Sequence, residues 1–231
     1  MKLKSTIKDI LNLRIIKQVF MPYKNNKVMK VITILTISLF LLISSSFSQG
    51  FAEDFSSFEK SINYELEGDY TQAISALKRT YSEKSYEYNY RLGWLDYLAG
   101  QYTESTTYYN KAISLMPMSI EARFGLISPL LALGKTNLAI DIYLEILEIA
   151  PNDTKANYRL GLILYQQEKY KEAEIYLKKI INIYPFDYDT LVLLGWNSLK
   201  MGKEKQARLL FQKALLYYPN DESAAEGLRQ L

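Results

Sequence analysis

Proline recurs in this chain at a constant interval of 34 residues, at Pro117, Pro151, Pro185 and Pro219. Two other sets of residues recur at the same interval of 34 residues. Small residues recur at Ser105, Ala139, Ala173 and Ala207, and aromatic residues or leucine recur at Tyr109, Tyr143, Leu177 and Phe211. A period of roughly 20 to 50 residues is the signature of a repeat array, in which each short unit stacks on the next. The period therefore predicts a row of similar units instead of one central core.

Each unit has the turn and capping residues expected of two helices joined by a tight turn. Glycine stands at the turn at Gly68, Gly100, Gly134 and Gly202, where it can adopt a left-handed backbone, and Glu168 replaces it in the fourth unit at a modest conformational cost. Each closing proline ends the second helix. The next helix is then expected to be capped by Asn152 or Asp153, by Asp187, and by Asn220 or Asp221.

A Leu-Gly pair marks the first helix of three units, at Leu92-Gly93, Leu160-Gly161 and Leu194-Gly195. Together with the turn glycine, the small residue, the aromatic residue and the closing proline, this pattern resembles the tetratricopeptide repeat (TPR) family. The resemblance implies an all-α fold, a right-handed solenoid of helical hairpins with about five repeats. The units are predicted at 54–87, 86–119, 120–153, 154–187 and 188–221.

The pattern departs from regularity at several places. Because the first two units overlap by two residues, the first loop between repeats is expected to be two residues short. Pro129 lies in the first helix of the third unit, where it removes a backbone donor and is expected to bend the helix. Asp96 and Ser198 stand where the family usually has tyrosine.

Residues 222–231 begin another helix and then stop. A solenoid needs a terminal element over the apolar face of its last repeat. Ala224, Ala225 and Leu228 are expected to form a partial cap. Since this cap is short, the end of the fifth unit is predicted to be open enough for self-association.

An uncharged run of thirteen residues, 31–43, follows Lys27 and Lys30 and precedes small polar residues. This order is that of a secretory signal peptide, and cleavage is expected after Ser48 or after Ala52. Residues 1–48 are therefore interpreted as a leader.

An internal start at Met29 would leave a signal of ordinary length, and residues 1–28 would then not be translated. The alternative to cleavage is an uncleaved membrane anchor, but the run is shorter than the roughly 20 residues that span a bilayer. The rest of the chain is expected to be exported, either to the periplasm or out of the cell.

Charge and composition exclude several functions. Residues 1–30 hold eight lysines and arginines against one acid, so the remaining 20 basic and 24 acidic residues have a net charge of −4. This balance argues against nucleic-acid binding. Cysteine and histidine are absent, which removes thiol nucleophiles, Cys/His zinc sites and imidazole bases. Gly134-Lys135-Thr136 looks like part of a phosphate-binding loop, but Pro129 stands where that motif needs glycine. No enzyme activity, cofactor or metal is predicted.

The first helices of stacked hairpins line the concave side of a solenoid. Residues at inward positions of these helices are predicted to bind a partner: Phe58, Tyr90, Trp94, Tyr97, Phe124, Tyr158, Tyr165 and Trp196. Tyrosine and tryptophan suit a binding site because they combine contact area with a polar tip. The same rings could instead pack between repeats, and for any single residue the two interpretations carry equal weight.

Some members of the resembled family hold acidic C-terminal peptides with a clamp of lysine, asparagine and arginine side chains. This sequence does not reproduce the clamp, because Trp94 and Leu162 stand at its asparagine positions. The prediction is therefore an exported scaffold that binds a protein segment, or a subunit of a cell-envelope assembly or secretion complex. A glycan stacked on the aromatic rings is the alternative, although Asn89, Asn157, Asp96 and Asp189 are few polar partners for a sugar. Contact with a membrane is expected only through an uncleaved leader.

Overall fold

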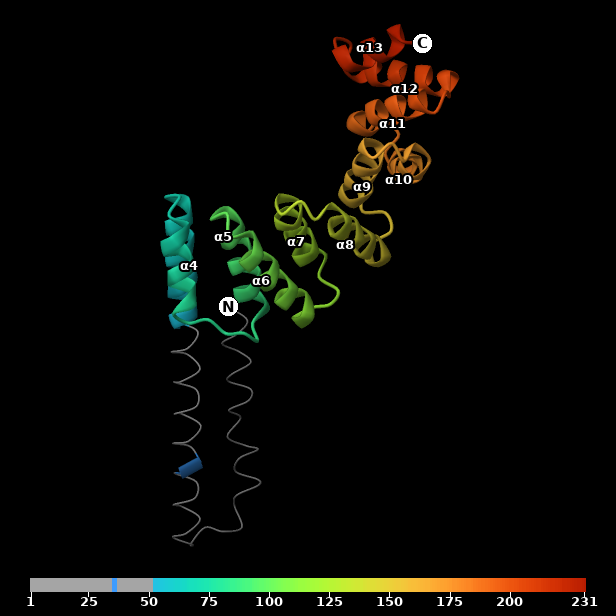
Figure 1. The fold of residues 1–231 in the computed structure, drawn as a ribbon. Helices are drawn as coiled ribbons and strands as arrows, with labels where there is room; N and C mark the ends of the chain where they lie inside the picture. Colours follow the sequence, from blue (N-terminus) through green and yellow to red (C-terminus); the bar gives the residue numbers. More distant parts are fainter. Residues whose placement is uncertain (1–34, 37–51) are drawn as a thin grey trace, which may run out of the picture. The chain divides into compact units, whose positions relative to one another are not determined.

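The computed structural model describes residues 35–36 and 52–231, and all regular secondary structure in these residues is helical (Figure 1). The chain divides into two compact units, Met1–Phe58 and Glu59–Leu231. The expected signal peptide lies outside the described residues, except for Leu35 and Thr36, which are helical and exposed. Among the described residues, no helix is both long and apolar enough to cross a membrane.

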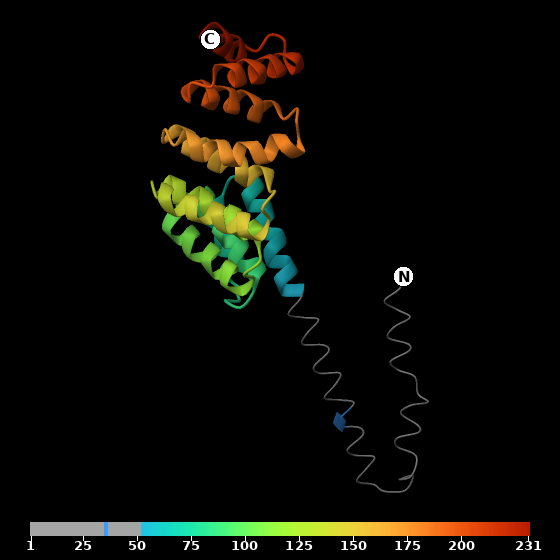
Figure 2. The ribbon, with the colours of Figure 1, turned by 90° about the vertical axis from the view of Figure 1, so that its right-hand side faces the viewer.

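The unit that ends at Leu231 is a solenoid of helical hairpins. Residues 52–66 are helical and precede α4 (Tyr70–Lys78), α5 (Tyr86–Leu98), α6 (Tyr102–Leu115), α7 (Ile120–Ala132), α8 (Thr136–Ile149), α9 (Thr154–Gln166), α10 (Tyr170–Ile183), α11 (Tyr188–Lys200), α12 (Glu204–Tyr217) and α13 (Glu222–Arg229). Within each hairpin the two helices pack together, and the second helix also contacts the first helix of the next hairpin (Figures 1 and 2). The all-α solenoid that the family resemblance implied is confirmed.

The predicted turns and caps are present. The turn residues have positive φ angles, at Gly68 (78°), Gly100 (75°), Gly134 (70°), Glu168 (61°) and Gly202 (70°). Of the alternative caps, Asp153 accepts a hydrogen bond from Ala156 N–H (2.7 Å) and Asp221 accepts one from Ala224 N–H (2.6 Å). Asp187 caps α11 in the same way. These bonds satisfy backbone donors that the first turn of a helix would otherwise leave unpaired.

In three hairpins, a polar side chain near the start of the first helix forms hydrogen bonds to the loop that precedes this helix. Each side chain donates to two loop carbonyls: Asn89 to Glu83 and Ser85, Arg123 to Pro117 and Ser119, and Asn157 to Pro151 and Asp153. Leu191 stands at the equivalent position of α11 and cannot donate. These hydrogen bonds fix the angle at which one repeat follows another.

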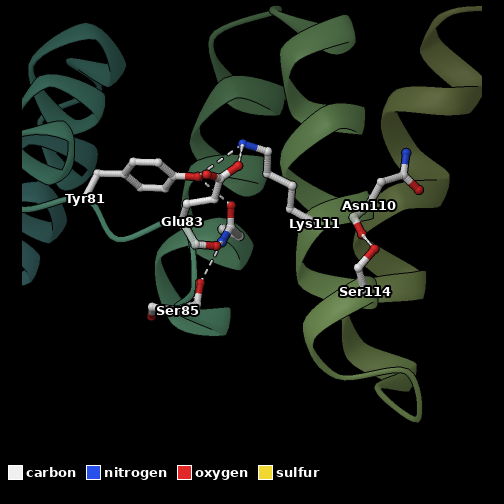
Figure 3. A network of polar contacts seen from close by, with 7 residues as sticks. Tyr81, Glu83, Ser85, Asn110, Lys111 and Ser114 are labelled. Carbon is white, nitrogen blue, oxygen red and sulfur yellow. Dashed lines mark hydrogen bonds and ion pairs between the residues drawn. The ribbon is translucent and has the colours of Figure 1, made fainter.

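The expectation of a short first loop is wrong. The segment 79–85 between α4 and α5 is longer than the four-residue loop 116–119, whereas α4 has 9 residues and α6 has 14. The chain leaves the helix early because Thr80 and Tyr81 bond to α5, where Thr80 contacts the Tyr88 hydroxyl (2.6 Å) and Tyr81 donates to Asn89 (2.9 Å). An ion pair between Lys111 and Glu83 (3.0 Å) completes this network, and Figure 3 shows the part of it around Tyr81, Glu83 and Lys111.

Pro129 lies inside α7, which runs without a break from Ile120 to Ala132. The residue is buried, and its carbonyl accepts the Leu133 N–H at 3.0 Å. The proline therefore does not end the helix, and the bend expected there remains a prediction.

An aromatic ring inserted between two glycines sets how closely the helices approach. Tyr109 of α6 is buried between Gly93 of α5 and Gly125 of α7. A Cβ on Gly93 would lie 2.9 Å from ring carbons of Tyr109, and one on Gly125 would overlap the ring more deeply. Only glycine leaves room for the ring at both places, because buried side chains are already packed to the density of a crystal.

The C-terminal helix repeats this arrangement. Phe211 of α12 lies against Gly195 of α11 and Gly227 of α13, so α13 packs as the first helix of a sixth hairpin would. Ala224 is buried there, and Leu228 and Leu231 pack against the same cluster. The residues that α13 and the chain end leave exposed are polar: Glu222, Ser223, Arg229 and Gln230. Self-association through the C-terminal repeat remains a prediction, and α12 of that repeat exposes Leu209, Leu216 and Tyr217.

A buried carboxyl is the least compatible group in the core. Asp96 of α5 is fully buried, and within the described residues neither of its carboxylate oxygens has a hydrogen-bond partner. Leucine stands at the equivalent position in α7 and α9, at Leu130 and Leu164. Burial raises the pKa of Asp96 to about 6, while the charge of Lys78 lowers it and that of Glu104 raises it. The charged form is therefore disfavoured in the folded chain.

We expect Gly125→Leu to lower the free energy of unfolding by about 3 kcal/mol, because the new side chain overlaps the buried Tyr109 ring. Leu177 and Leu193 occupy the equivalent pair of positions later in the array. The double variant Gly125→Leu/Tyr109→Leu should therefore regain more than half of the loss. Urea unfolding followed by circular dichroism measures both, and additive losses would contradict this packing account.

We expect Asp96→Asn to stabilise the fold above neutral pH. A carboxyl whose pKa is higher in the folded than in the unfolded chain makes the fold less stable as the pH rises through that range. The unmodified chain should therefore lose stability between about pH 4 and pH 6, and above pH 7 the variant should exceed it by about 2 kcal/mol. Urea unfolding at several pH values tests this, with Asp189→Asn as an exposed control. A difference independent of pH would show that the charge of Asp96 is not the cause.

Candidate partner-binding groove

Two adjoining hollows lie along the first helices of the hairpins. The aromatic hollow, about 530 Å³, is lined by Tyr90, Trp94 and Tyr97 of α5, by Glu121, Phe124 and Ser128 of α7, and by Lys155 of α9, with Tyr109, Ile120 and Gly125 beneath. The basic hollow, about 780 Å³, is lined by residues of α7, α8 and α9 that include Leu131, Lys155, Arg159 and Gln166. Because both share Phe124, Ser128 and Lys155, they form one continuous groove across α5, α7 and α9.

Helical periodicity places these side chains on one face. Tyr90, Trp94 and Tyr97 are separated by four and three residues, and Lys155, Arg159, Leu162 and Gln166 follow the same spacing on α9. Residues three or four apart lie on the same side of a helix. The opposite faces carry the buried residues that pack against the second helices, so the fold presents the groove residues as a set.

Hydrogen bonding fixes the orientation of Trp94. Its indole Nε1 donates to Glu65 (2.7 Å), which also forms an ion pair with Arg91. The indole ring is tilted against Tyr97 with the ring centroids 6.0 Å apart, and the residue is 38% exposed. The donor is thus already used, and a ligand in the hollow would meet the ring surface instead.

Tyrosine hydroxyls gather around Glu121 at the rim of the aromatic hollow. Tyr86 donates to Glu121 (3.2 Å) and shares a hydrogen bond of 2.8 Å with Ser119. The Tyr90 ring stacks on Tyr86, with a centroid separation of 5.8 Å. Burial, with the charge of Glu121, raises the pKa of Tyr90 to about 12. Tyr90 is therefore protonated and neutral at physiological pH.

Three charged side chains line the groove without forming an ion pair in the part of the chain that the structure describes: Glu121, Lys155 and Arg159. The Lys155 ammonium lies 4.4 Å from the centroid of the Phe124 ring, in cation–π contact. The groove is therefore acidic at the α7 rim of the aromatic hollow and basic along α9.

The structure brings together four of the eight predicted residues, Tyr90, Trp94, Tyr97 and Phe124, in the aromatic hollow. Tyr158 and Tyr165 line neither hollow and pack against the C-terminal core cluster. Trp196 packs on Phe211 with a centroid separation of 5.3 Å and donates to Ser223 (2.9 Å). Phe58 is half-buried in the N-terminal unit. Binding by any of the eight remains a prediction.

The predicted set omitted the polar half of the groove. It was chosen for aromatic side chains, whereas Lys155, Arg159, Glu121 and Ser128 also line the hollows. A signal for two of them was readable in the sequence, since Lys155 and Glu121 occupy the same position of successive repeats with opposite charge. Most of the polar residues considered for a glycan are instead in the core. Asn89 and Asn157 are buried and donate to loop carbonyls, and Asp96 is fully buried.

A stack of helical hairpins with an open groove on its first helices defines a class of scaffold that mediates protein–protein interaction. The chain belongs to the tetratricopeptide repeat family, whose members are generally not enzymes. A family model described as "Tetratricopeptide repeat" matches residues 189–221, and one described as "Anaphase-promoting complex, cyclosome, subunit 3" matches residues 98–180.

Several solved structures share the fold. A tetratricopeptide repeat protein from Parabacteroides merdae ATCC 43184 is 23% identical with a TM-score of 0.67, covering 76% of this chain and 71% of that chain. MamA is 22% identical with a TM-score of 0.62, covering 71% of this chain and 90% of its own. YrrB, described as a tetratricopeptide repeat protein with an unusual peptide-binding site, is 15% identical with a TM-score of 0.63, covering 80% and 97%. No curated protein matches the chain.

Proposed function

We propose that this chain is an exported scaffold whose groove across α5, α7 and α9 holds a segment of a partner protein, within a cell-envelope assembly or a secretion complex. The observation that carries this proposal is the continuity of the aromatic and basic hollows through Phe124, Ser128 and Lys155. Two joined hollows suit an extended chain that places successive side chains in each. A compact ligand would need only one of them.

The composition of the groove supports a protein ligand. Exposed aromatic surface at Trp94 and apolar surface at Leu131 provide area for burial, and the three unpaired charges provide specificity. YrrB, which shares the fold at low identity, is described as binding a peptide, so a stack of this kind can hold one.

A glycan is the weaker alternative. Sugar recognition combines ring stacking with amide and carboxylate hydrogen bonds to hydroxyl groups. Asn89, Asn157 and Asp96 are in the core and cannot supply those bonds. The aromatic hollow retains ring surfaces for stacking, but its nearest acid, Glu121, already accepts a hydrogen bond from Tyr86.

Export is supported by the sequence of the leader. The uncharged run 31–43 follows basic residues and precedes small ones, as in secretory signals. Without residues 1–30 the chain has a net charge of −4, which also fits a scaffold that acts apart from nucleic acid. An envelope complex is the setting in which an exported binding module of this size would act.

A photo-crosslinking amino acid at Gln166, which lines the basic hollow, should give an adduct with one specific protein in the producing cells. The same amino acid at Ile175 of α10, which is exposed but lines neither hollow, serves as the matched control. Adding Trp94→Ala/Leu131→Ala should reduce the adduct at position 166 about tenfold, because both hollows lose contact surface. Mass spectrometry identifies the adduct. The same products from both positions, or none from Gln166, would contradict the proposal.

Export predicts a processed N-terminus. N-terminal sequencing of the chain recovered from outside the cytoplasm should begin at Gln49 or at Glu53. Leu39→Arg should block processing and retain the full-length chain, because a charge interrupts the apolar run. Deletion of residues 1–28 should leave export intact. A full-length chain found only in the cytoplasm would contradict the signal-peptide interpretation.

A further inference from the structure

We propose that the aromatic hollow binds a basic side chain, lysine or arginine, of the partner segment. This inference rests on the proposed function and specifies the chemistry of one part of the ligand. Its basis is the combination of several ring surfaces with a carboxylate that has no cationic partner among the described residues.

The aromatic rings of the hollow favour a cation as the ligand. Aromatic faces attract cations within about 6 Å of the ring centroid, most strongly when the ring is tryptophan. Trp94 cannot use its N–H for a ligand because Glu65 accepts that donor at 2.7 Å. The indole face therefore remains as its contact surface, beside Tyr97, in a hollow that Phe124 also lines.

Glu121 provides a negative charge that complements this cation. Its carboxylate is exposed at the rim of the hollow, where it accepts a hydrogen bond from the neutral hydroxyl of Tyr86 and also interacts with the hydroxyl of Tyr90. A carboxylate next to aromatic faces is complementary to an ammonium or guanidinium group, which can pair with the acid while its stem lies on the rings. An apolar side chain would leave this charge without a counter-ion and would dehydrate it in part.

The protein already contains one contact of this kind. The Lys155 ammonium lies over Phe124, at the boundary between the two hollows. Its charge would repel a second cation placed nearby, so Lys155 and Glu121 should act on the ligand in opposite directions. The binding of an apolar side chain would depend little on the charge of Lys155 or of Glu121. Removing each charge in turn therefore distinguishes a basic ligand from an apolar one.

The test uses the mature chain and two capped amino acids, N-acetyl-arginine methylamide and N-acetyl-norleucine methylamide, followed by amide shifts in two-dimensional NMR. Capped arginine should shift resonances of α5 and α7 and bind at least about fivefold more tightly than capped norleucine. Glu121→Gln should weaken arginine binding about fivefold, and Lys155→Met should tighten it about two- to threefold. Glu148→Gln, at an exposed acid on α8 that lines neither hollow, should change nothing.

Three results would overturn the inference: equal binding of the two capped amino acids, unchanged arginine binding in Glu121→Gln, or no saturable shift with capped arginine. Any of these together with an intact crosslink at Gln166 would leave the groove as a protein-binding site with an apolar anchor. If the photo-crosslinking amino acid at position 166 gives no adduct in a chain without other substitutions, that result would instead count against the proposed function itself.

Discussion

The contact of Tyr109 with Gly93 and Gly125 links the core of this protein to its binding surface. The ring is buried between α5 and α7, and it also forms part of the base of the aromatic hollow. The distance between these two helices, and hence the width of the hollow, depends on one side chain for which glycine makes room on both sides. A solenoid has no central core to compensate for a local change, since each hairpin touches only its neighbours. The width of the aromatic hollow therefore depends on the packing of Tyr109 against the two glycines.

The same repeat position can serve the groove in one place and the core in another. Trp94 and Trp196 occupy equivalent positions, three repeats apart. Trp94 is 38% exposed and donates to Glu65 of the helical segment 52–66, whereas Trp196 packs on Phe211 and donates to Ser223 of α13. The residue at the second position of the next first helix also differs, since α13 has a small serine, Ser223, where α7 has Glu121. Two identical residues in a periodic sequence thus have different surroundings.

This dependence on neighbours explains how much could be predicted from the sequence. The turn at Glu168 and the cap at Asp187 follow from local backbone chemistry and were predicted, and the cap at Asp153 was one of two alternatives. The early end of α4 was not, because it depends on bonds from Thr80 and Tyr81 to side chains of another helix. Likewise, Tyr90 and Tyr158 occupy equivalent positions and both pack against a core cluster, and no periodic pattern shows that Tyr90 also lines a hollow whereas Tyr158 does not.

Charge at one exposed repeat position gives the groove its polarity. Glu87, Glu121, Lys155 and Asp189 occupy the second residue of successive first helices, and all are exposed. Stability is nearly indifferent to the sign of such exposed charges. A ligand lying across α7 and α9 would meet Glu121 and then Lys155, so the order of charges fixes the direction in which a charged segment can bind. In the proposed binding mode, fold and charge selectivity therefore depend on different residues: the glycines and buried rings set the spacing of the helices, and an exposed residue that the fold leaves free to vary would select the charge that the groove accepts.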